Sequence, residues 1–533
     1  MHPTSGLITK TPFPLFLLAS IGVYGLLFPL LSWTTFSGDD AHILRVAAEY
    51  NWLPPFYSHE VYTQLSASNF TPFVLTIYRV LLQLFGLSSA AFLAFMLLSI
   101  AAFTALAGQL AWQLTNSRSL PWLLMLLLYS IFTLPSLLTR FYTSHYILGG
   151  CFALFSLILA FRHDNRALQH WLCGFFLLLA MLCKEVYVVL PAILILPNLI
   201  NRSYKNILPT LTAVAAYLFL RITVIGETGN EGRSAAGIIS ALLAIGSANW
   251  LHFLLWYGKT RAVILLATVV AILVSPKRVL KLLPLALVFV LPTLAAPHGF
   301  LMPELHGDRI FFALDGALAM AAVVAMHGSI LESSFDRRMA LPALLALVLI
   351  VALSIHYTNN AALKNELQQT PDYKITEYML REIDSLESKT LFVPLAFTQG
   401  DIANVQTWLG HPAYEITHNC LLALASPADQ LIAFNNAGDL IDRQQLEDSC
   451  QAAAPDVEVL VAPRVDKGYI QWELRFADGF SGGVLFVDRG YAAPTASFSL
   501  LMGNPKPGER YQLFANRGNQ WWFSPVMPIE VRD

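Results

Sequence analysis

Two adjacent carboxylates, Asp39 and Asp40, follow the first long apolar run of the chain, where residues 37–42 read SGDDAH. A carboxylate at the edge of a membrane is costly to keep there, and residues of this kind are usually functional. A carboxylate that reaches a hydroxyl group can remove its proton during attack, which makes Asp39 a candidate general base. Asp40 would hold an acceptor, orient Asp39 or help to bind a divalent metal, with His42 supporting the pair. The alternative is a solvated acidic loop.

Three cations stand beside other apolar runs and could bind an anion. Arg140 ends one run, Lys184 lies between two runs in the sequence LCKE at 182–185, and Arg309 precedes another run in DRIFF at 308–312. A guanidinium group offers a phosphate two parallel donors, whereas an ammonium group acts as a point charge. If these three side chains converge, they predict a phosphate-binding site, which we call the cationic cluster.

The carboxylates next to these cations have supporting roles in this interpretation. Glu185 would position what Lys184 binds, and Asp308 would support Arg309. Lys184 and Arg309 also have ordinary structural explanations. Lys184 and Glu185 could form an ion pair that caps a tight helical hairpin, and Arg309 could extend to lipid headgroups.

The elements that must carry these residues are membrane helices. Hydrophobic residues make up 56% of the 533 residues and charged residues only 13%, whereas soluble domains carry about 25% charge. Apolar runs recur from Phe13 to Tyr357, and runs of that length are typical of transmembrane helices, in which the backbone satisfies its own hydrogen bonds. The formal net charge of −2 and the lack of a basic stripe argue against nucleic acid as a partner.

The placement of Lys and Arg in short loops predicts the orientation of the helices, because such loops stay in the cytoplasm. It gives about eleven crossings, with the N-terminus inside and everything after Tyr357 outside. The predicted spans are 13–33, 88–114, 120–138, 146–161, 168–183, 186–200, 207–225, 262–275, 282–297, 310–328 and 340–357. Two further apolar stretches, 71–86 and 238–258, do not fit this alternation and are interpreted as interfacial or re-entrant helices on the outer side. The acidic pair, which opens a long outer loop at 37–70, and the cationic cluster then share the outer face.

The chain after residue 358 has the composition of a small soluble domain. Residues 372–388 have a charged helical pattern, and strand-like runs follow at 391–394, 457–461, 469–476 and 483–487. We therefore predict a transmembrane domain at 1–358, which includes the outer loop, and an extracytoplasmic α+β domain at 359–533.

Two cysteines, Cys420 and Cys450, lie in this C-terminal region. Outside the cytoplasm they can form a disulfide, although two unpaired thiols are also compatible with the sequence.

These motifs, in this order, resemble the GT-C superfamily of membrane glycosyltransferases, and most of all its branch of protein O-mannosyltransferases and tetratricopeptide-containing O-mannosyltransferases. The acidic pair after the first helix of that family is matched by Asp39 and Asp40. Its proline motif before a helix that ends in Phe-Gly is matched by NFTP at 69–72 and LFG at 84–86. The segments 182–185 and 308–312 match its Lys-Glu helix end and its late Arg-aromatic motif.

The resemblance covers about residues 10–330, with some departures. Thr71 stands where relatives often carry Arg, Leu134 and Pro135 lack the usual preceding His, and no tetratricopeptide repeats follow.

The resemblance implies a mainly α polytopic membrane enzyme that moves a hexosyl or pentosyl group from a polyprenyl-phosphate donor to an acceptor on the non-cytoplasmic face. Asp39 would be the general base, and Arg309, Lys184 and Arg140 would stabilise the charge of the departing phosphate. The acceptor, whether protein, lipid or glycan, stays open, as does the need for a divalent metal. The expected location is a bacterial inner membrane, with the C-terminal domain in the periplasm.

Three other functions are compatible with parts of this pattern. A transporter or flippase for a lipid-linked saccharide would also place charge near lipid, but transporters often have repeated halves and charge near the middle of the membrane. An O-antigen-type ligase or polymerase relies on a similar outer-face arginine, usually with a large late outer loop. A non-catalytic scaffold with an extracytoplasmic sensing domain would show no donor turnover.

Overall fold

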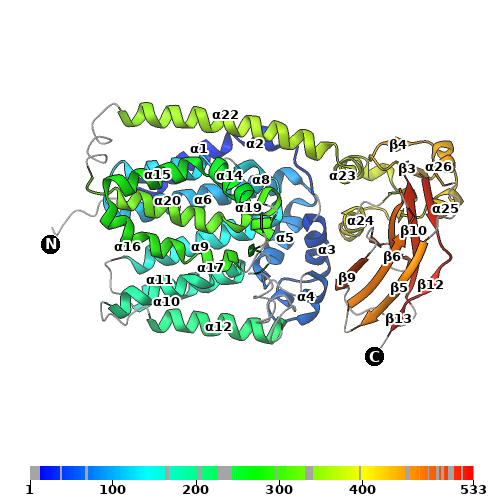
Figure 1. The fold of residues 1–533 in the computed structure, drawn as a ribbon, viewed down its shortest axis with the longest axis horizontal. Helices are drawn as coiled ribbons and strands as arrows, with labels where there is room; N and C mark the ends of the chain where they lie inside the picture. The colour runs from blue at the N-terminus through cyan, green and yellow to red at the C-terminus, as the bar shows by residue number, and fades with distance from the viewer. Residues whose placement is uncertain are drawn as a thin grey trace. The chain divides into compact units, whose positions relative to one another are not determined.

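The protein divides into two compact units, whose elements Figure 1 shows in a computed structural model. Unit 1 is Met1–Thr34, Ser68–Val74 and Ala90–Ala362, and unit 2 is Thr35–Ala67, Leu75–Ser89 and Leu363–Asp533. The structure describes residues 12–36, 39–65, 70–131, 133–162, 167–200, 207–225, 243, 245–246, 248–294, 298–301, 303–329, 340–394, 398–450, 457–466, 469–477, 479–487, 491–493, 497–501, 509–517 and 520–531.

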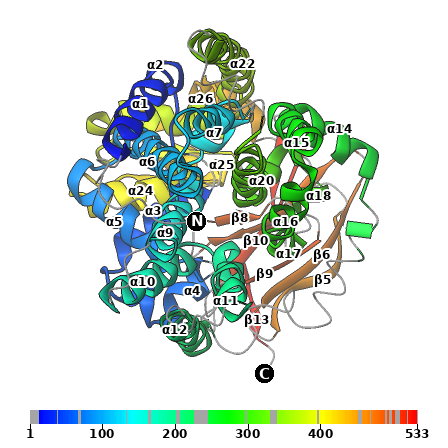
Figure 2. The same cartoon turned by 90° about the vertical axis from the view of Figure 1, so that its left-hand side faces the viewer.

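Unit 1 is built from α-helices, and Figure 2 views many of them nearly end-on. Helices suit these apolar segments because they satisfy backbone hydrogen bonds without water. The elements are α1 (Phe13–Gly25), α2 (Phe28–Leu31), α6 (Ser89–Thr115), α7 (Leu120–Tyr129), α8 (Leu134–Leu138), η2 (Phe141–Thr143), α9 (Ser144–Ala160), α10 (Ala167–Cys183), η3 (Glu185–Val189), α11 (Leu190–Ile200), α12 (Ile207–Ile225), α14 (Trp250–Thr260), α15 (Ala262–Val274), α16 (Pro276–Leu287), α17 (Val290–Leu294), α18 (His298–Leu301), α19 (Pro303–Ile310), α20 (Phe312–Ala325) and α22 (Ala340–Gln368), where η denotes a 3-10 helix.

Among the described residues, three helical segments are long and apolar enough to cross a membrane: α6, η2 together with α9, and α12. A fourth span results if α14 and α15, which meet at an angle of 84°, are counted as one. Shorter apolar helices lie in other predicted spans, among them α1, α7, α10 and α20. The mainly α fold class with a β-containing C-terminal region is confirmed, and the number of crossings stays a prediction.

Several predicted spans are interrupted. The spans at 88–114 and 207–225 coincide with α6 and α12, but 13–33 divides into α1 and α2, and 120–138 divides into α7 and α8. A proline stands in the first turn of α2 and of α8, where its missing N–H would have had no partner in any case. Part of the stretch 238–258 lies outside the described residues, and its end forms α14.

Unit 2 joins segments of the predicted outer loop to the C-terminal part of the chain. The early segments contain α3 (Asp39–Glu49), η1 (Pro54–Phe56), α4 (His59–Leu65) and most of α5 (Pro72–Phe85). Helix α22 runs without a break through the predicted domain boundary at 358–359, and unit 2 resumes at Leu363. Next come α23 (Pro371–Arg381) and η5 (Ile383–Ser385), so the predicted helical stretch at 372–388 is helical only as far as Ser385 and is interrupted at Glu382.

Three small sheets form the rest of unit 2, in the orders β2-β1-β3-β4, β11-β10-β7-β8 and β13-β5-β6-β9, with β12 beside β10. Strand β1 is parallel to β2 and β3, so helices make the crossovers that parallel neighbours need. The elements are β1 (Thr390–Phe392), α24 (Thr398–Trp408), β2 (Glu415–Thr417), α25 (Cys420–Ala425), β3 (Leu431–Phe434), β4 (Leu440–Ile441), α26 (Arg443–Ser449), β5 (Val457–Asp466), β6 (Tyr469–Phe476), β7 (Ser481–Phe486), β8 (Tyr491–Ala493), β9 (Ser497–Leu501), β10 (Arg510–Arg517), β11 (Gln520–Phe523), β12 (Met527–Pro528) and β13 (Glu530–Val531).

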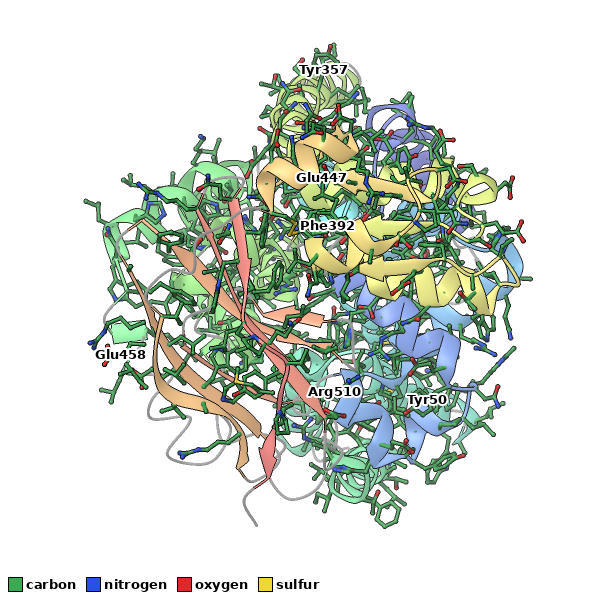
Figure 3. The ribbon with its side chains drawn as sticks, turned by 90° about the vertical axis from the view of Figure 1, so that its right-hand side faces the viewer. Tyr50, Tyr357, Phe392, Glu447, Glu458 and Arg510 are labelled. Atoms are coloured by element: carbon green, nitrogen blue, oxygen red, sulfur yellow. A yellow bond between two sulfur atoms is a disulfide. The ribbon has the colours of Figure 1, made fainter. Side chains whose placement is uncertain are left out.

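Strands β7 and β10 are buried on both faces and connect two hydrophobic cores. Successive side chains of a strand point to opposite faces, so Val484 packs with Trp472 of β6 in one core. Leu485 and Phe514 pack in the other core with Phe392 of β1, which Figure 3 labels. The small sheets are therefore held together through these two shared strands.

The structure joins Cys420 and Cys450 in a disulfide, with a Cα–Cα distance of 6.0 Å and a sequence separation of 30 residues. A loop of this size should stabilise the fold by roughly 3–4 kcal/mol. We expect the double substitution of Cys420 and Cys450 by Ala to lower the thermal unfolding temperature of the purified protein, whereas Cys173→Ala, at a buried free thiol, should cause a smaller loss. Maleimide labelling of Cys420 in the native protein without a reductant would contradict the pairing.

Candidate active site

Helix α3 begins with the acidic pair, and its two carboxylates have different surroundings. Asp40 is fully buried, and the Tyr78 hydroxyl of α5 donates a hydrogen bond to its Oδ1 at 2.7 Å. Asp39 is exposed. A buried carboxylate held by a hydroxyl is suited to orienting its neighbour, while an exposed carboxylate can meet a reacting group.

Two members of the cationic cluster lie over aromatic rings at the start of α9 and in η2, which directly precedes it. The Lys184 Nζ lies 5.0 Å from the centroid of the Tyr146 ring, and the Arg309 Cζ lies 5.0 Å from the centroid of the Tyr142 ring. His145, which is buried, is close enough to Lys184 and Arg309 to be affected by both charges. The structure therefore brings Lys184 and Arg309 to one end of a helix whose N-terminus is itself favourable for anions.

Close packing fixes this end of α9. A Cβ atom on Gly149 would lie only 2.4 Å from Cε2 of Tyr187, so the Tyr187 ring lies directly on the α9 backbone. The Tyr187 hydroxyl donates to the Tyr146 carbonyl. On the preceding turn, the Thr143 hydroxyl is within 2.7 Å of the Leu137 carbonyl. Because Tyr187 follows Lys184 by one helical turn, the same packing positions the lysine backbone.

Glu185 is held by residues far from it in sequence. Its carboxylate forms an ion pair with Arg221 of α12, and it accepts a hydrogen bond from the Phe70 backbone N–H at 3.2 Å. The Phe70 ring lies 6.2 Å from the Tyr217 ring, measured between centroids. Glu185 thus links the segment before α5 to α12. This role is structural, although Glu185 is the residue that follows Lys184.

Asp308 belongs to a buried ionic cluster that the sequence motifs do not predict. Arg261, only 2% exposed, lies at the bend between α14 and α15. Its Nε donates to Asp315 Oδ2 at 3.0 Å, and its Nη1 lies 3.5 Å from Asp308 Oδ1. Arg140 also acts electrostatically on Asp308, which places that member of the cationic cluster near the residue preceding Arg309.

Two aromatic residues complete this cluster. The Tyr257 hydroxyl donates to Asp315 Oδ1 at 2.9 Å, and the Trp256 ring lies 4.7 Å from Arg261 Cζ. A Cβ atom on Gly307 would fall within 2.2 Å of Trp256, so α14 packs directly on the α19 backbone two residues before Arg309. The buried ionic cluster around Arg261 therefore holds in place the helical turn that carries Arg309.

We expect Asp315→Asn to destabilise the protein by about 3 kcal/mol, because removing one partner of a buried ion pair leaves charge uncompensated. Tyr257→Phe removes a single hydrogen bond to the same carboxylate and should cost only about 1 kcal/mol. Thermal unfolding of the detergent-solubilised variants measures both. An Asp315→Asn variant as stable as the parent would show that the pair contributes nothing to folding.

The structure brings together part of what the sequence predicted. Lys184 and Arg309 both lie beside the start of α9, with Arg140 near Asp308, while Asp39, Asp40 and His42 lie together on α3 in unit 2. The prediction missed the tyrosines and His145 at the start of α9, and it missed Arg221, Arg261 and Asp315. Arg221 and Asp315 lie inside predicted spans, so the rule that charges within apolar spans are functional or paired would have marked them.

The described residues contain no group of three or more His, Cys, Asp or Glu side chains arranged to hold a metal ion. Asp39 and Asp40 therefore have no third ligand of these types within the described ranges.

Comparisons with known proteins gave two solved structures. No protein-family model matches the chain, and no curated protein matches it. The chain is similar to the crystal structure of ArnT from Cupriavidus metallidurans bound to undecaprenyl phosphate, with 13% sequence identity and a TM-score of 0.35. It is also similar to the apo form of that protein, with 14% identity and a TM-score of 0.36. Each match covers 84% of this chain and 92% of the other chain.

Proposed function

We propose that this chain is a membrane glycosyltransferase that moves a sugar from a polyprenyl-phosphate donor to a hydroxyl group of an acceptor on the non-cytoplasmic face. The observation that carries the proposal is the placing of two cations at the start of α9. There Lys184 and Arg309 lie over Tyr146 and Tyr142, at one end of an apolar segment long enough to cross a membrane. An anion carried on a lipid would present its phosphate at such a position.

The chemistry follows from the charges involved. The acceptor hydroxyl attacks the anomeric carbon and gives its proton to Asp39, while the bond between that carbon and the phosphate oxygen breaks. The polyprenyl phosphate leaves with the bonding electrons, and Lys184 and Arg309, aided by Arg140, stabilise its charge. Fixed cations do this more strongly in a site shielded from water. A single displacement of this kind inverts the anomeric configuration.

The compartment follows from the C-terminal region. The disulfide between Cys420 and Cys450 is of the kind that persists in oxidising compartments such as the bacterial periplasm. We therefore propose a multi-pass inner-membrane protein with its C-terminal region in the periplasm, in contact with membrane lipids and the lipid-linked donor.

The decisive experiment is an assay of the full-length protein in proteoliposomes, with a radiolabelled sugar on undecaprenyl phosphate and a mixture of lipid, peptide and glycan acceptors. We expect label to move to one acceptor class and undecaprenyl phosphate to be released in equal amount. Movement of the intact donor across the bilayer without cleavage would instead identify a flippase. In a parallel assay with a diphosphate-linked glycan as donor, transfer of the glycan with release of undecaprenyl diphosphate would identify a ligase or polymerase.

A further inference from the structure

The helix that carries the acidic pair is clamped at both ends by α5. Near its start, Tyr78 donates to the buried Asp40. Near its end, the Arg79 guanidinium donates from Nη1 to the carbonyls of Ala47 and Ala48, at 3.0 and 2.6 Å. A cation at the C-terminal carbonyls of a helix satisfies groups that lack partners within the helix and complements the helix dipole. Two neighbouring residues of α5 therefore hold α3 near both of its ends.

A second contact to α3 comes from the C-terminal region. Helix α24 packs against α3, and its Asp401 accepts from Arg45 Nε at 2.7 Å and lies 3.5 Å from His42 Nδ1. Arg45 also pairs with Glu49 at 2.7 Å. Burial on its own would lower the pKa of Arg45, but Asp401 and Glu49 outweigh it and hold that pKa above its ordinary value. The Arg45 guanidinium therefore stays charged, and both carboxylates bind it.

Helix α24 also holds α5. The Arg79 Cζ lies 4.4 Å from the centroid of the Trp408 ring, at the last residue of α24. A Cβ atom on Gly86, just after α5, would lie 3.9 Å from Leu409. The residue that caps the end of α3 is therefore itself covered by the end of α24, and the three helices form a closed set of contacts within unit 2.

We propose that α24 is a positioning element for the acidic pair, with Asp401 fixing the rotation of α3 and Trp408 holding the Arg79 cap. The expected effect of α24 on catalysis rests on the proposed function. Asp401 and Trp408 do not touch substrate in this scheme. They act through Arg45, His42 and Arg79, so that the C-terminal region belongs to the catalytic machinery and is not an appended binding module.

The test compares Asp401→Ala with Glu447→Ala, which breaks a similar ion pair at 3.1 Å between Arg443 and Glu447 on α26 of the same region. We expect Asp401→Ala to lower kcat by about tenfold to a hundredfold, as a small displacement of a reacting group does. The donor KM and the binding of undecaprenyl phosphate should not change. Glu447→Ala should leave all three quantities unchanged.

Two further measurements separate positioning from general damage. Exchanging the charges, with Arg45→Asp and Asp401→Arg in one chain, should restore at least part of kcat. Hydrogen exchange of the α3 backbone amides should accelerate in Asp401→Ala and not in Glu447→Ala, whatever the activity of the protein is. Unchanged exchange in α3, or a loss of kcat that the exchanged pair does not restore, overturns the proposal. If hydrogen exchange accelerates in Asp401→Ala but Asp39→Asn retains full turnover, the assignment of Asp39 as the base is wrong. The conclusion that Asp401 positions α3 is then still supported.

Discussion

Replacing Asp39 by Asn should lower the turnover of sugar transfer by about a hundredfold to ten-thousandfold, which is the usual contribution of a general base. The amide has nearly the same size but cannot accept the proton of the acceptor hydroxyl. Because Asp39 is exposed at the first turn of α3 and Asp40 supplies the buried contact to Tyr78, the substitution should leave folding intact. Undecaprenyl phosphate should bind as before, since the cationic cluster is unchanged.

The control for this prediction is Glu60→Gln, which removes another exposed carboxylate from the same early segment, on α4. Its turnover should equal that of the parent. The measurement is initial rate at saturating donor, with equilibrium binding of undecaprenyl phosphate alongside. Normal turnover by Asp39→Asn would refute the assignment of the base, and loss of lipid binding in that variant would assign Asp39 to the donor instead.

Replacing Arg309 by Gln should weaken the binding of undecaprenyl phosphate by at least about tenfold, since a hydrogen bond to a charged group contributes about 1.5–3 kcal/mol. Lys184→Gln should have a similar effect. Arg309→Lys should be intermediate, because it keeps the charge but loses the planar guanidinium that lies over Tyr142. The combined Lys184 and Arg309 variant need not show the sum of the two losses, because neighbouring charges are coupled.

Arg162→Gln is the matched control, because this exposed arginine lies just beyond the other end of α9. It should bind undecaprenyl phosphate like the parent protein. Binding is measured by displacement of a labelled lipid phosphate at two salt concentrations. Equal affinity in the Arg309→Gln variant and the parent would remove Arg309 from the site.

The sequence predicted those features that depend on local pattern. The run 469–476 forms β6 with the same bounds, because its aromatic and β-branched residues lie between turn signals. The acidic pair was found because two carboxylates directly follow an apolar run. The common location of Lys184 and Arg309 followed from loop charges, which constrain the side of the membrane on which each helix end lies.

The pairings that hold these features in place could not be predicted in the same way. Asp401 stands in an ordinary polar segment, and nothing near it in sequence indicates that it pairs with Arg45 of α3. The partners of Arg261 are likewise set by how α14, α19 and α20 pack. Hydropathy also averages over breaks such as the one between α1 and α2, so helix ends inside apolar runs were misplaced.

The burial of β7 and β10 on both faces limits how this protein can be truncated or how its parts can be transplanted. A shortened chain that kept only the parallel sheet around β1 would lose Leu485 and Phe514, which cover Phe392. One that kept only the other two sheets would leave those same two side chains without their contact to Phe392. Any portion of the C-terminal region that an engineer expresses or transplants must therefore include at least the whole stretch from β1 to β13.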